Sequence, residues 1–321
     1  MTALSDQPNK RDSSVPGWLQ WSALGANRRK DALPNGFVLD ERFTIRSFLG
    51  EGGFGYTYKA TDTSGQVFVL KECYPKTLCR RNGLTVGLKA AAHEEQVQRI
   101  RRQFRQEAKA LAVLDHGNIV DGGEVIEEHG TIYLVMSYVK GCQMGAMPRG
   151  LNRKATVTRA EKISLKLLSA LEHVHNSGYL HNDISPENII LEGKRNPLLI
   201  DFGTCSKIDS TQSAELADDL IVVKPGYSPP EFYCSEFQKT RQSDIYQLGA
   251  TLYKAVTREQ PMEAMQRLSE FARKGRDRMQ TALELHQPLN PRFFDAIAKA
   301  TSYDVSQRFE TVTEWKSYLD G

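Results

Sequence analysis

An aspartate and an asparagine stand five residues apart in the stretch HNDISPEN, residues 181–188. Asp183 can accept a proton, and Asn188 can donate or accept hydrogen bonds through its amide. Apolar residues frame this polar stretch, YL before it and IIL after it, and the second group has the pattern of a buried strand. The framing predicts that the carboxylate and the amide are held in fixed positions, as chemistry that depends on placement requires.

A second group of residues with chemical meaning is the glycine-rich run Gly50-Glu51-Gly52-Gly53-Phe54-Gly55. Alternating segments stand on both sides of it, FTIRSFL before and YTYKA after, and a turn at 62–65 leads to a third, QVFVLK. This order predicts a hairpin with the glycines at its bend, where backbone N–H groups can approach a polyphosphate. It excludes a dinucleotide-binding unit, in which the last glycine starts a helix.

Lys71 ends the third alternating segment with the parity of Val67 and Val69, so it is expected to point inward with them. A buried ammonium needs an anionic partner. The helix expected before Leu114 has apolar residues at 97, 100, 104, 111 and 114, and Glu107 fills the gap of seven. Because a carboxylate in an apolar stripe is explained by a buried cation, we predict a Lys71–Glu107 ion pair.

The composition is that of an ordinary globular protein. Of 321 residues, 40% are hydrophobic and 25% are charged, and the net charge of +3 is too small to indicate nucleic acid as an obligatory partner. No apolar run approaches the roughly 20 residues that cross a bilayer, and the first residues lack the apolar core of a signal peptide. Five cysteines without a C-x-x-C pair favour free thiols and a cytoplasmic location over disulfides or a zinc site.

These features, with several later ones, resemble the protein kinase family, specifically the bacterial serine/threonine kinases of eukaryotic type. HNDISPEN is similar to the catalytic loop, LLIDFGTCSK to the metal-binding Asp-Phe-Gly segment, and GYSPPEF to the end of the activation segment. SDIYQLGATLY resembles the buried helix of the larger lobe, and Arg308 resembles the late arginine that pairs with Glu231. So many motifs in the family's order make chance agreement negligible.

The resemblance covers residues 37–319 and implies an α+β fold of two lobes, a small antiparallel sheet with one main helix and a larger, mostly helical lobe. The expected organisation is a flexible tail over residues 1–33, a small lobe over 34–136 and a large lobe over 137–321. Segment 73–103 is longer than the usual link between strand and helix, and we expect an insertion there. It could bias the position of the helix with Glu107 or be a surface elaboration without a regulatory role.

The implied activity is transfer of the γ-phosphoryl group of ATP to serine and threonine hydroxyls of proteins, with Mg²⁺ as the second cofactor. Asp183 is then the base that orients the hydroxyl and accepts its proton. Asn188 and Asp201 are the implied Mg²⁺ ligands, since hard oxygen donors suit this ion. Lys71, fixed by Glu107, would hold the ATP phosphates.

The adenine is expected along the hinge LVMSYVKG, residues 134–141. Met136 would guard the back of the pocket, the backbone of Ser137 and Val139 would bind adenine, and Gln143 would lie near the ribose. The other expected nucleotide contacts come from the glycine-rich hairpin and the following strand: Leu49, Gly50, Glu51, Gly52, Gly53, Phe54, Gly55, Thr57 and Val69.

Two departures from the family pattern form one hypothesis. Ser185 stands where serine/threonine kinases carry a lysine, and Lys224 stands where they carry a threonine in the activation segment. Since those two groups lie together in the family, we hypothesise that the Lys224 ammonium replaces the missing cation beside the transferring phosphoryl group. The alternative is a Lys224 side chain that points to solvent.

A third departure is Asn182, which replaces the arginine that reads a phosphate on the activation segment. We therefore hypothesise that phosphorylation of this segment does not gate activity, although it offers four acceptors: Ser206, Ser210, Thr211 and Ser213. His181 is expected to be a structural core residue rather than a proton-transfer group.

Two other functions compete with an active protein kinase. The missing catalytic-loop lysine would suit a pseudokinase that serves as a scaffold. A scaffold would, however, be expected to have lost at least one of the residues Lys71, Glu107, Asp183, Asn188 and Asp201, all of which are present. The loop also resembles those of choline- and aminoglycoside-type kinases, which usually lack the Ser-Pro-Pro-Glu segment and its arginine partner. The sequence does not predict the protein substrate, the upstream signal or the oligomeric state.

Overall fold

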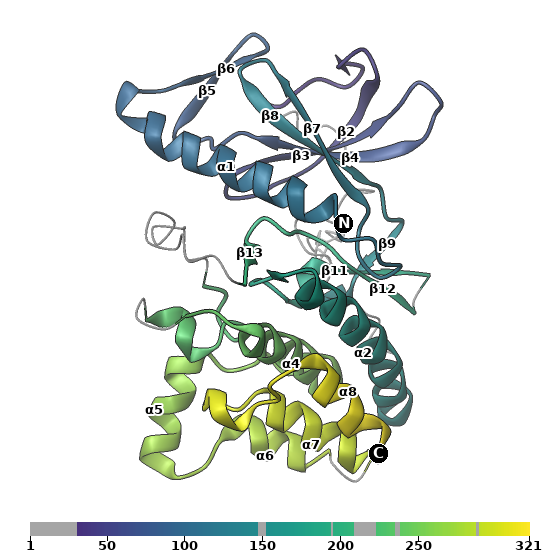
Figure 1. Cartoon of the computed structure of the whole chain (residues 1–321), viewed down its shortest axis with the longest axis vertical. Coiled ribbons are helices and arrows are strands. Elements are labelled where there is room, and N and C mark those ends of the chain that lie inside the picture. The colour runs from purple at the N-terminus through teal and green to yellow at the C-terminus, as the bar shows by residue number, and fades with distance from the viewer. Residues whose placement is uncertain (1–30, 147–151, 194, 209–222, 235–237, 287–288) are drawn as a thin grey trace, which may run out of the picture.

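The computed structural model describes residues 31–146, 152–193, 195–208, 223–234, 238–286 and 289–321. The chain forms two lobes, a small one built on a sheet and a larger one built from helices (Figure 1), which confirms the predicted α+β class. Most of the tail expected over residues 1–33 lies outside the described residues. Leu33, at its end, is buried in the small lobe and donates its amide to the Tyr58 hydroxyl at 3.1 Å.

The small lobe is a six-stranded antiparallel sheet in the order β1-β2-β3-β4-β8-β7. β2 and β3 pair across the glycine-rich run, as predicted, and Gly65, with φ +87°, closes the turn before β4. On β4, Phe68 and Leu70 pack into the outer core while Val69 and Lys71 face the cleft. The six strands are β1 (Val38–Leu39), β2 (Phe43–Glu51), β3 (Gly55–Thr61), β4 (Val67–Cys73), β7 (Gly122–Glu128) and β8 (Thr131–Ser137).

Helix α1 (Glu94–Leu111) packs against β7, β8 and β4 and lies along the cleft side of the sheet (Figure 1). Of the segment 73–103 that was expected to be an insertion, residue 73 belongs to β4 and the last ten residues belong to α1. Between them lie a hairpin of β5 (Cys79–Asn82) and β6 (Thr85–Leu88) and the short 3-10 turn η1 (Ala91–His93).

The large lobe is built around α4, in which twelve residues are buried, as the resemblance of SDIYQLGATLY to the buried helix of the family implied. The Asn152 side chain accepts the Ala155 amide and so begins α2, and a capping box at Thr240 begins α4. The helices are α2 (Arg153–Asn176), α4 (Arg241–Thr257), α5 (Ala264–Lys274), α6 (Arg278–Glu284), α7 (Pro291–Ala300) and α8 (Val312–Asp320).

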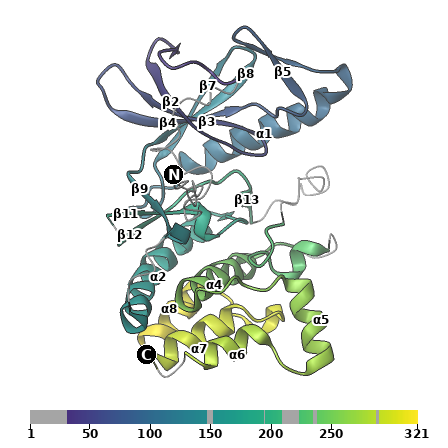
Figure 2. The ribbon, with the colours of Figure 1, turned by 180° about the vertical axis from the view of Figure 1, so that it is seen from behind.

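Two small sheets lie between the helical lobe and the cleft (Figure 2). One is formed by β9 (Gly141–Gln143), β11 (Ile189–Glu192) and β12 (Asn196–Leu199), and the other by β10 (Tyr179–Leu180) and β13 (Ser206–Lys207). Short 3-10 turns stand beside them and farther along the chain: η2 (Met144–Ala146), η3 (Pro186–Asn188), η4 (Pro230–Tyr233) and η6 (Val305–Gln307).

A buried ion pair ties the activation-segment end to the C-terminal helices. The Arg308 guanidinium donates to both carboxylate oxygens of Glu231, at 2.7 and 3.1 Å, and the Ser243 hydroxyl donates to the same carboxylate at 2.8 Å. Both charged side chains are almost fully buried. The predicted Glu231–Arg308 pair is confirmed, and the Ser243 hydrogen bond links η4 to α4.

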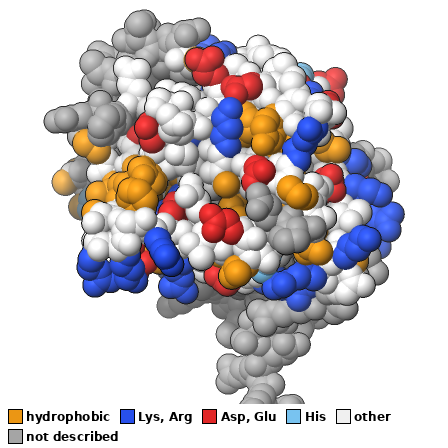
Figure 3. All heavy atoms as spheres, turned by 90° about the horizontal axis from the view of Figure 1, so that it is seen from below, with side chains coloured by type: hydrophobic (Ala, Val, Ile, Leu, Met, Phe, Trp, Pro, Cys, Tyr) orange, Lys and Arg blue, Asp and Glu red, His pale blue; other side chains and the backbone are white. Residues whose placement is uncertain are grey.

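Seen from below, the helical lobe carries basic, acidic and apolar side chains interspersed on one face (Figure 3). This distribution is in keeping with the small net charge of +3. Among the described residues, no helix combines the length and the apolar character that a membrane span requires.

Candidate active site

A cavity of about 350 Å³ lies between the two lobes. The glycine-rich hairpin and β4 form its upper wall, the hinge after β8 forms its back, and the catalytic loop and the Asp-Phe-Gly segment form its floor. Most of the predicted residues line it: Gly50, Glu51, Gly52, Gly53, Phe54, Gly55, Thr57, Val69, Lys71, Glu107, Met136, Ser137, Val139, Asp183, Asn188 and Asp201.

Two predicted nucleotide contacts lie off the cavity wall. Leu49 is buried at 4% exposure, on the strand before the glycines. Gln143 is fully buried, because β9 pairs with β11 and turns this side chain into the protein, where it donates to the Glu187 carbonyl at 2.8 Å. The expectation that Gln143 lies near the ribose is therefore wrong for this structure, and Leu49 is buried without lining the cavity.

Lys71 joins two carboxylates from different elements. Its ammonium lies 2.8 and 3.0 Å from the Glu107 oxygens and 2.8 Å from Asp201 Oδ1. Burial alone would lower the pKa of Lys71, but the two carboxylates raise it well above its usual value. Glu107 is 1% exposed on α1, so the predicted pair is confirmed and the carboxylate in the apolar stripe has its cation.

The two carboxylates respond differently to this cation. Burial raises the pKa of Glu107, although Lys71 opposes the change. Burial alone would also raise the pKa of Asp201, but the adjacent Lys71 ammonium lowers it to about 2. Asp201 is therefore ionised throughout the physiological range and can serve as an oxygen donor.

The backbone of the catalytic loop is fixed by two buried side chains of α4. Asp244 accepts the amides of His181 and Asn182 at 2.9 and 2.8 Å, and Gln247 accepts the Ile184 amide at 2.9 Å. These bonds satisfy amides that would otherwise be buried without partners. His181 itself is fully buried, with its ring 4.6 Å from the Phe202 ring, which is in keeping with a structural role.

Asn188 fixes the side chain of Asp183. Its Nδ2 donates at 2.7 Å both to the Asp183 carbonyl and to Asp183 Oδ2. Burial raises the pKa of Asp183, while Lys224 lowers it and Asp201 raises it further. The opening motif is thus a rigid unit, in which the amide orients the carboxylate five residues before it.

Lys224 points into this unit rather than to solvent. Its Nζ lies 2.9 Å from Ser185 Oγ, 3.2 Å from Asp183 Oδ1 and 3.3 Å from a carboxylate oxygen of Glu187. The structure therefore brings the two exchanged positions together, and it adds Glu187, which the sequence reasoning did not single out. The sequence signal for Glu187 was its position directly before Asn188, the implied metal ligand.

Asn182 holds the start of the activation segment without using charge. Its Nδ2 donates to the Thr204 carbonyl at 3.0 Å and to the Ser206 hydroxyl at 2.9 Å. Asn182 has φ +65°, a left-handed conformation that asparagine adopts more readily than most residues. The other three predicted phosphate acceptors, Ser210, Thr211 and Ser213, lie outside the described residues.

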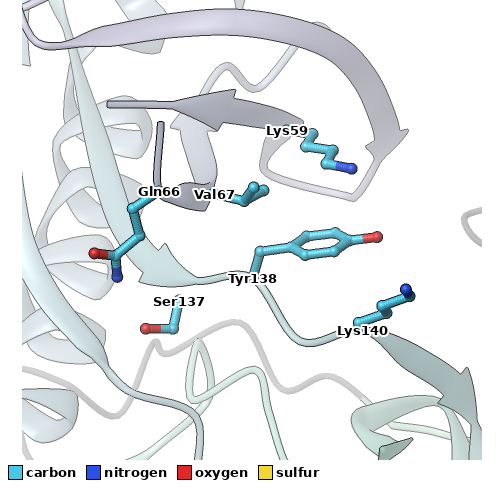
Figure 4. A pocket seen from close by; sticks show the side chains of 6 residues that line it. All are labelled: Lys59, Gln66, Val67, Ser137, Tyr138 and Lys140. Atoms are coloured by element: carbon cyan, nitrogen blue, oxygen red, sulfur yellow. The ribbon is translucent and has the colours of Figure 1, made fainter. Parts of the chain in front are cut away.

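The hinge has a second hollow on its other side, which Figure 4 shows with its six lining side chains. Ser137 and Tyr138 line both this hollow and the cavity, so the hinge is the wall between them. The Lys59 ammonium lies 4.5 Å from the centre of the Tyr138 ring, a cation–π contact that links the hinge to β3.

Several cavity residues were not predicted from the sequence. They are mainly apolar groups of the floor and back, which close the cavity around a flat ligand, and small residues after Asp201. Buried apolar residues directly after Asn188 and before Asp201 were the available signal. The residues are Gln103, Phe104, Val120, Tyr138, Ile190, Ile200, Gly203 and Thr204.

Comparison with known proteins supports the kinase interpretation of this geometry. The family model described as "Protein kinase domain" matches residues 43–317. A probable serine/threonine-protein kinase of Clostridium perfringens is 27% identical over 287 residues, which cover 87% of this chain and 38% of that protein. The probable serine/threonine-protein kinase PknB of Bifidobacterium longum is 29% identical over 302 residues, covering 87% of this chain and 40% of that protein.

A solved structure, "PpkA-294 apo form", superposes with a TM-score of 0.72 at 28% identity and covers 90% of this chain and 99% of that one. The chain thus spans less than half the length of the two curated relatives, while it matches the solved chain almost completely. The family match covers most of the sequence and includes every catalytic motif described above. The chain belongs to the protein kinase family, and bacterial serine/threonine-protein kinases are among its relatives.

Proposed function

We propose that this chain is a protein kinase that uses ATP and Mg²⁺ to phosphorylate serine or threonine hydroxyls of proteins. The observation that supports this most is the convergence of Lys71, Glu107, Asp183, Asn188 and Asp201 on one cavity. Phosphoryl transfer needs placement and charge stabilisation more than covalent chemistry. A paired ammonium, a positioned base and two oxygen donors around one cavity supply these needs.

In this proposal Asp183 orients the substrate hydroxyl and accepts its proton. Its carboxylate is 16% exposed and is held by the Asn188 amide, so its position is set before substrate binds. Burial raises its pKa, which makes it a stronger base than an exposed aspartate. The raised pKa still has to lie below the working pH, and Lys224 favours the ionised form.

The donor set fits Mg²⁺. Asn188 uses its Nδ2 to bind Asp183, which leaves its carbonyl oxygen for another partner, while Lys71 and the Gly203 amide both bind Oδ1 of Asp201. Within the described residues, no three His, Cys, Asp or Glu side chains cluster as a complete metal site. Mg²⁺ commonly takes one or two protein oxygens and completes its shell with phosphates and water. When bound, it would neutralise charge on the phosphates.

The nucleotide itself would lie against the hinge. The backbone of Ser137 and Val139 offers hydrogen bonds for adenine, and Met136 closes the back of the cavity. The glycine-rich hairpin would cover the phosphates, because Gly52 and Gly53 line the cavity and glycines let the backbone N–H groups approach closely. Lys71 would bind the phosphates while Glu107 keeps it in place.

We further propose that Lys224 replaces the missing catalytic-loop lysine. Its ammonium lies within 3.3 Å of Asp183 and is 23% exposed, so it is both close to the reacting atoms and partly desolvated. A positioned cation in such a site stabilises negative charge that develops on the transferred group. This placement supports an active kinase over a pseudokinase, because a cation lies beside the proposed base.

The proposal extends to partners and location. The substrates would be proteins that present a serine or threonine hydroxyl at the mouth of the cavity. All five cysteines are free thiols. Free thiols are common in reducing compartments and support the proposal that the chain works in the cytoplasm.

The experiment is transfer of labelled phosphate from ATP by the purified chain, with and without Mg²⁺, to itself and to a generic serine-rich protein. Asp183→Asn is the control that should abolish transfer while nucleotide still binds. Choline and an aminoglycoside are offered in parallel. Nucleotide binding without transfer would favour the scaffold, and transfer only to the small molecules would favour a small-molecule kinase.

A further inference from the structure

Residues 74–89, between β4 and α1, contact three elements that line the nucleotide cavity: β4, the glycine-rich hairpin and helix α1. We name this segment the brace; it contains the β5–β6 hairpin, with Gly83 in the left-handed region at its bend. We propose that the brace presets the ATP site, with Arg81 as a positioning residue that never contacts the nucleotide. The inference rests on the proposed function only in taking ATP as the ligand.

The first contact joins the brace to the strand that carries Lys71. Glu72, the next residue on β4, points to the opposite face and is fully buried. Its carboxylate receives Arg81 at 2.5 Å, the Tyr58 hydroxyl at 2.8 Å and the Tyr133 hydroxyl at 3.1 Å. Three donors, one of them a cation, satisfy a charge that would otherwise be costly to bury.

Arg81 is itself locked into the small lobe. Its Nε donates to the Asp31 carbonyl at 2.7 Å, one Nη donates to the Leu84 carbonyl at 3.0 Å, and its guanidinium lies 5.0 Å from the centre of the Tyr74 ring. Only 6% of the side chain is exposed. A side chain with this many partners has one conformation, so it can transmit position from the hairpin to Glu72.

The second contact joins the brace to the glycine-rich hairpin. The Tyr74 amide donates to the Phe54 carbonyl at 3.0 Å, and the Lys76 ammonium pairs with the Glu51 carboxylate. A Cβ on Gly55 would lie 1.7 Å from the Glu72 carbonyl oxygen, so only glycine allows this approach. The bend over the phosphates is therefore attached at both ends to the start of the brace.

The third contact joins the brace to the helix that carries Glu107. The Leu78 carbonyl accepts the Lys89 amide at 2.9 Å and lies 3.3 Å from His93 Nδ1, at the N-terminus of α1. Val97, on the first turn of α1, packs in one core cluster with Cys79 and Val86 of the brace. Because a helix moves largely as a rigid rod, support at this end constrains Glu107 farther along.

The test is Arg81→Met in the full chain, compared at a temperature well below the unfolding midpoint of each protein. We measure the Kd of a fluorescent ATP analogue with Mg²⁺ and the KM values for ATP and for a protein substrate. We expect the Kd and KM for ATP to rise about tenfold, because the variant leaves the Glu72 carboxylate buried without its cation and the strand that carries Lys71 should shift. The KM for the protein substrate should stay unchanged. Arg81→Lys should recover most of the affinity.

Arg42→Met is the matched control, because Arg42 also pairs with acidic side chains of the small lobe but lies on the surface. It should leave nucleotide affinity at the wild-type value. If Arg81→Met does not fold, Lys76→Met tests the surface arm of the brace, where a rise of about threefold in Kd is expected for a partly exposed ion pair.

An unchanged Kd for the nucleotide in the folded Arg81→Met or Lys76→Met protein overturns the proposal, as does an equal rise in both KM values. The outcome is separate from that of the proposed function. A wild-type chain that binds the analogue but transfers no phosphate would refute the kinase activity, and the brace would still be judged by the Kd values.

Discussion

Lys224 Nζ lies 2.9 Å from Ser185 Oγ and 3.2 Å from Asp183 Oδ1. A cation from the activation segment therefore occupies the neighbourhood of the base. The Ser228 side chain helps to hold the segment there, since its Oγ accepts the Lys224 amide at 2.9 Å. The position of the base and the position of this segment are thus coupled through one side chain.

Removal of the cation should impair catalysis more than binding. For Lys224→Ala we expect kcat to fall about 10²- to 10³-fold, the usual cost of losing one positioned electrostatic group. The KM for ATP should change little, because Lys224 is not among the residues that line the nucleotide cavity. Steady-state kinetics with varied ATP measure both.

The exchange-back variant Ser185→Lys/Lys224→Thr is the stringent companion of that experiment. It should recover most of the activity lost in Lys224→Ala, because it returns an ammonium to the same place from the other wall. Lys316→Ala, which breaks a surface pair with Glu172, is the control and should behave as wild type. Full activity in Lys224→Ala would end the hypothesis.

The pH dependence of the reaction should depend on the contact between Lys224 and Asp183. Burial raises the pKa of Asp183 and Lys224 lowers it, so the pKa should rise further in Lys224→Met. The base acts in its ionised form, and activity falls as the pH drops through its pKa. The acidic limb of kcat/KM should therefore move to higher pH in the variant, measured between about pH 5 and 8, and an unmoved limb would contradict the coupling.

The activation segment should not require phosphorylation. Alanine at Ser206, Ser210, Thr211 and Ser213 together should leave kcat/KM within about twofold, because Asn182 offers no guanidinium to pair with a phosphate. The bond from Asn182 to Ser206 is lost in this variant, but the bond to the Thr204 carbonyl remains. Near-complete loss of activity would refute the hypothesis.

The buried Glu231–Arg308 pair should dominate the stability of the large lobe. Arg308→Met leaves a carboxylate buried without its cation, and we expect the free energy of unfolding to fall by about 3–5 kcal/mol. The double variant Arg308→Met/Glu231→Gln should lose less, since it removes both charges. Denaturant titration measures both proteins, and equal losses in the two would show that packing rather than charge is responsible.

The sequence predicted best those features whose physical cause lies in the pattern of neighbouring residues. Glu107 could be paired with Lys71 because a carboxylate inside an apolar stripe has few explanations, and the two groups lie 2.8 Å apart. The glycine-rich bend was identified by the alternating segments around it. Lys224 and Ser185 were brought together only through the family resemblance, since no local pattern connects residues so far apart.

The misplaced residues depended on long-range pairing. Gln143 lies on a three-residue strand whose orientation is set by β11, and no periodicity is visible in so short an element. The β5–β6 hairpin did carry a local signal, the pair Asn82-Gly83 between alternating residues, which is a strong hairpin marker. The pairing of Arg81 with Glu72 could not be predicted. The Glu72 side chain points away from the cleft, and no motif of the nucleotide site involves that face of β4.

The three-way contact of Lys71 with Glu107 and Asp201 has a consequence for the order in which ligands enter. The ammonium is already paired with the aspartate at 2.8 Å, so a divalent ion arriving alone meets a positively charged neighbour. A polyphosphate brings negative charge that can draw the lysine toward itself and release the aspartate. We therefore expect the metal ion and the nucleotide to bind together, because the phosphates can take over Lys71 while the ion takes over Asp201.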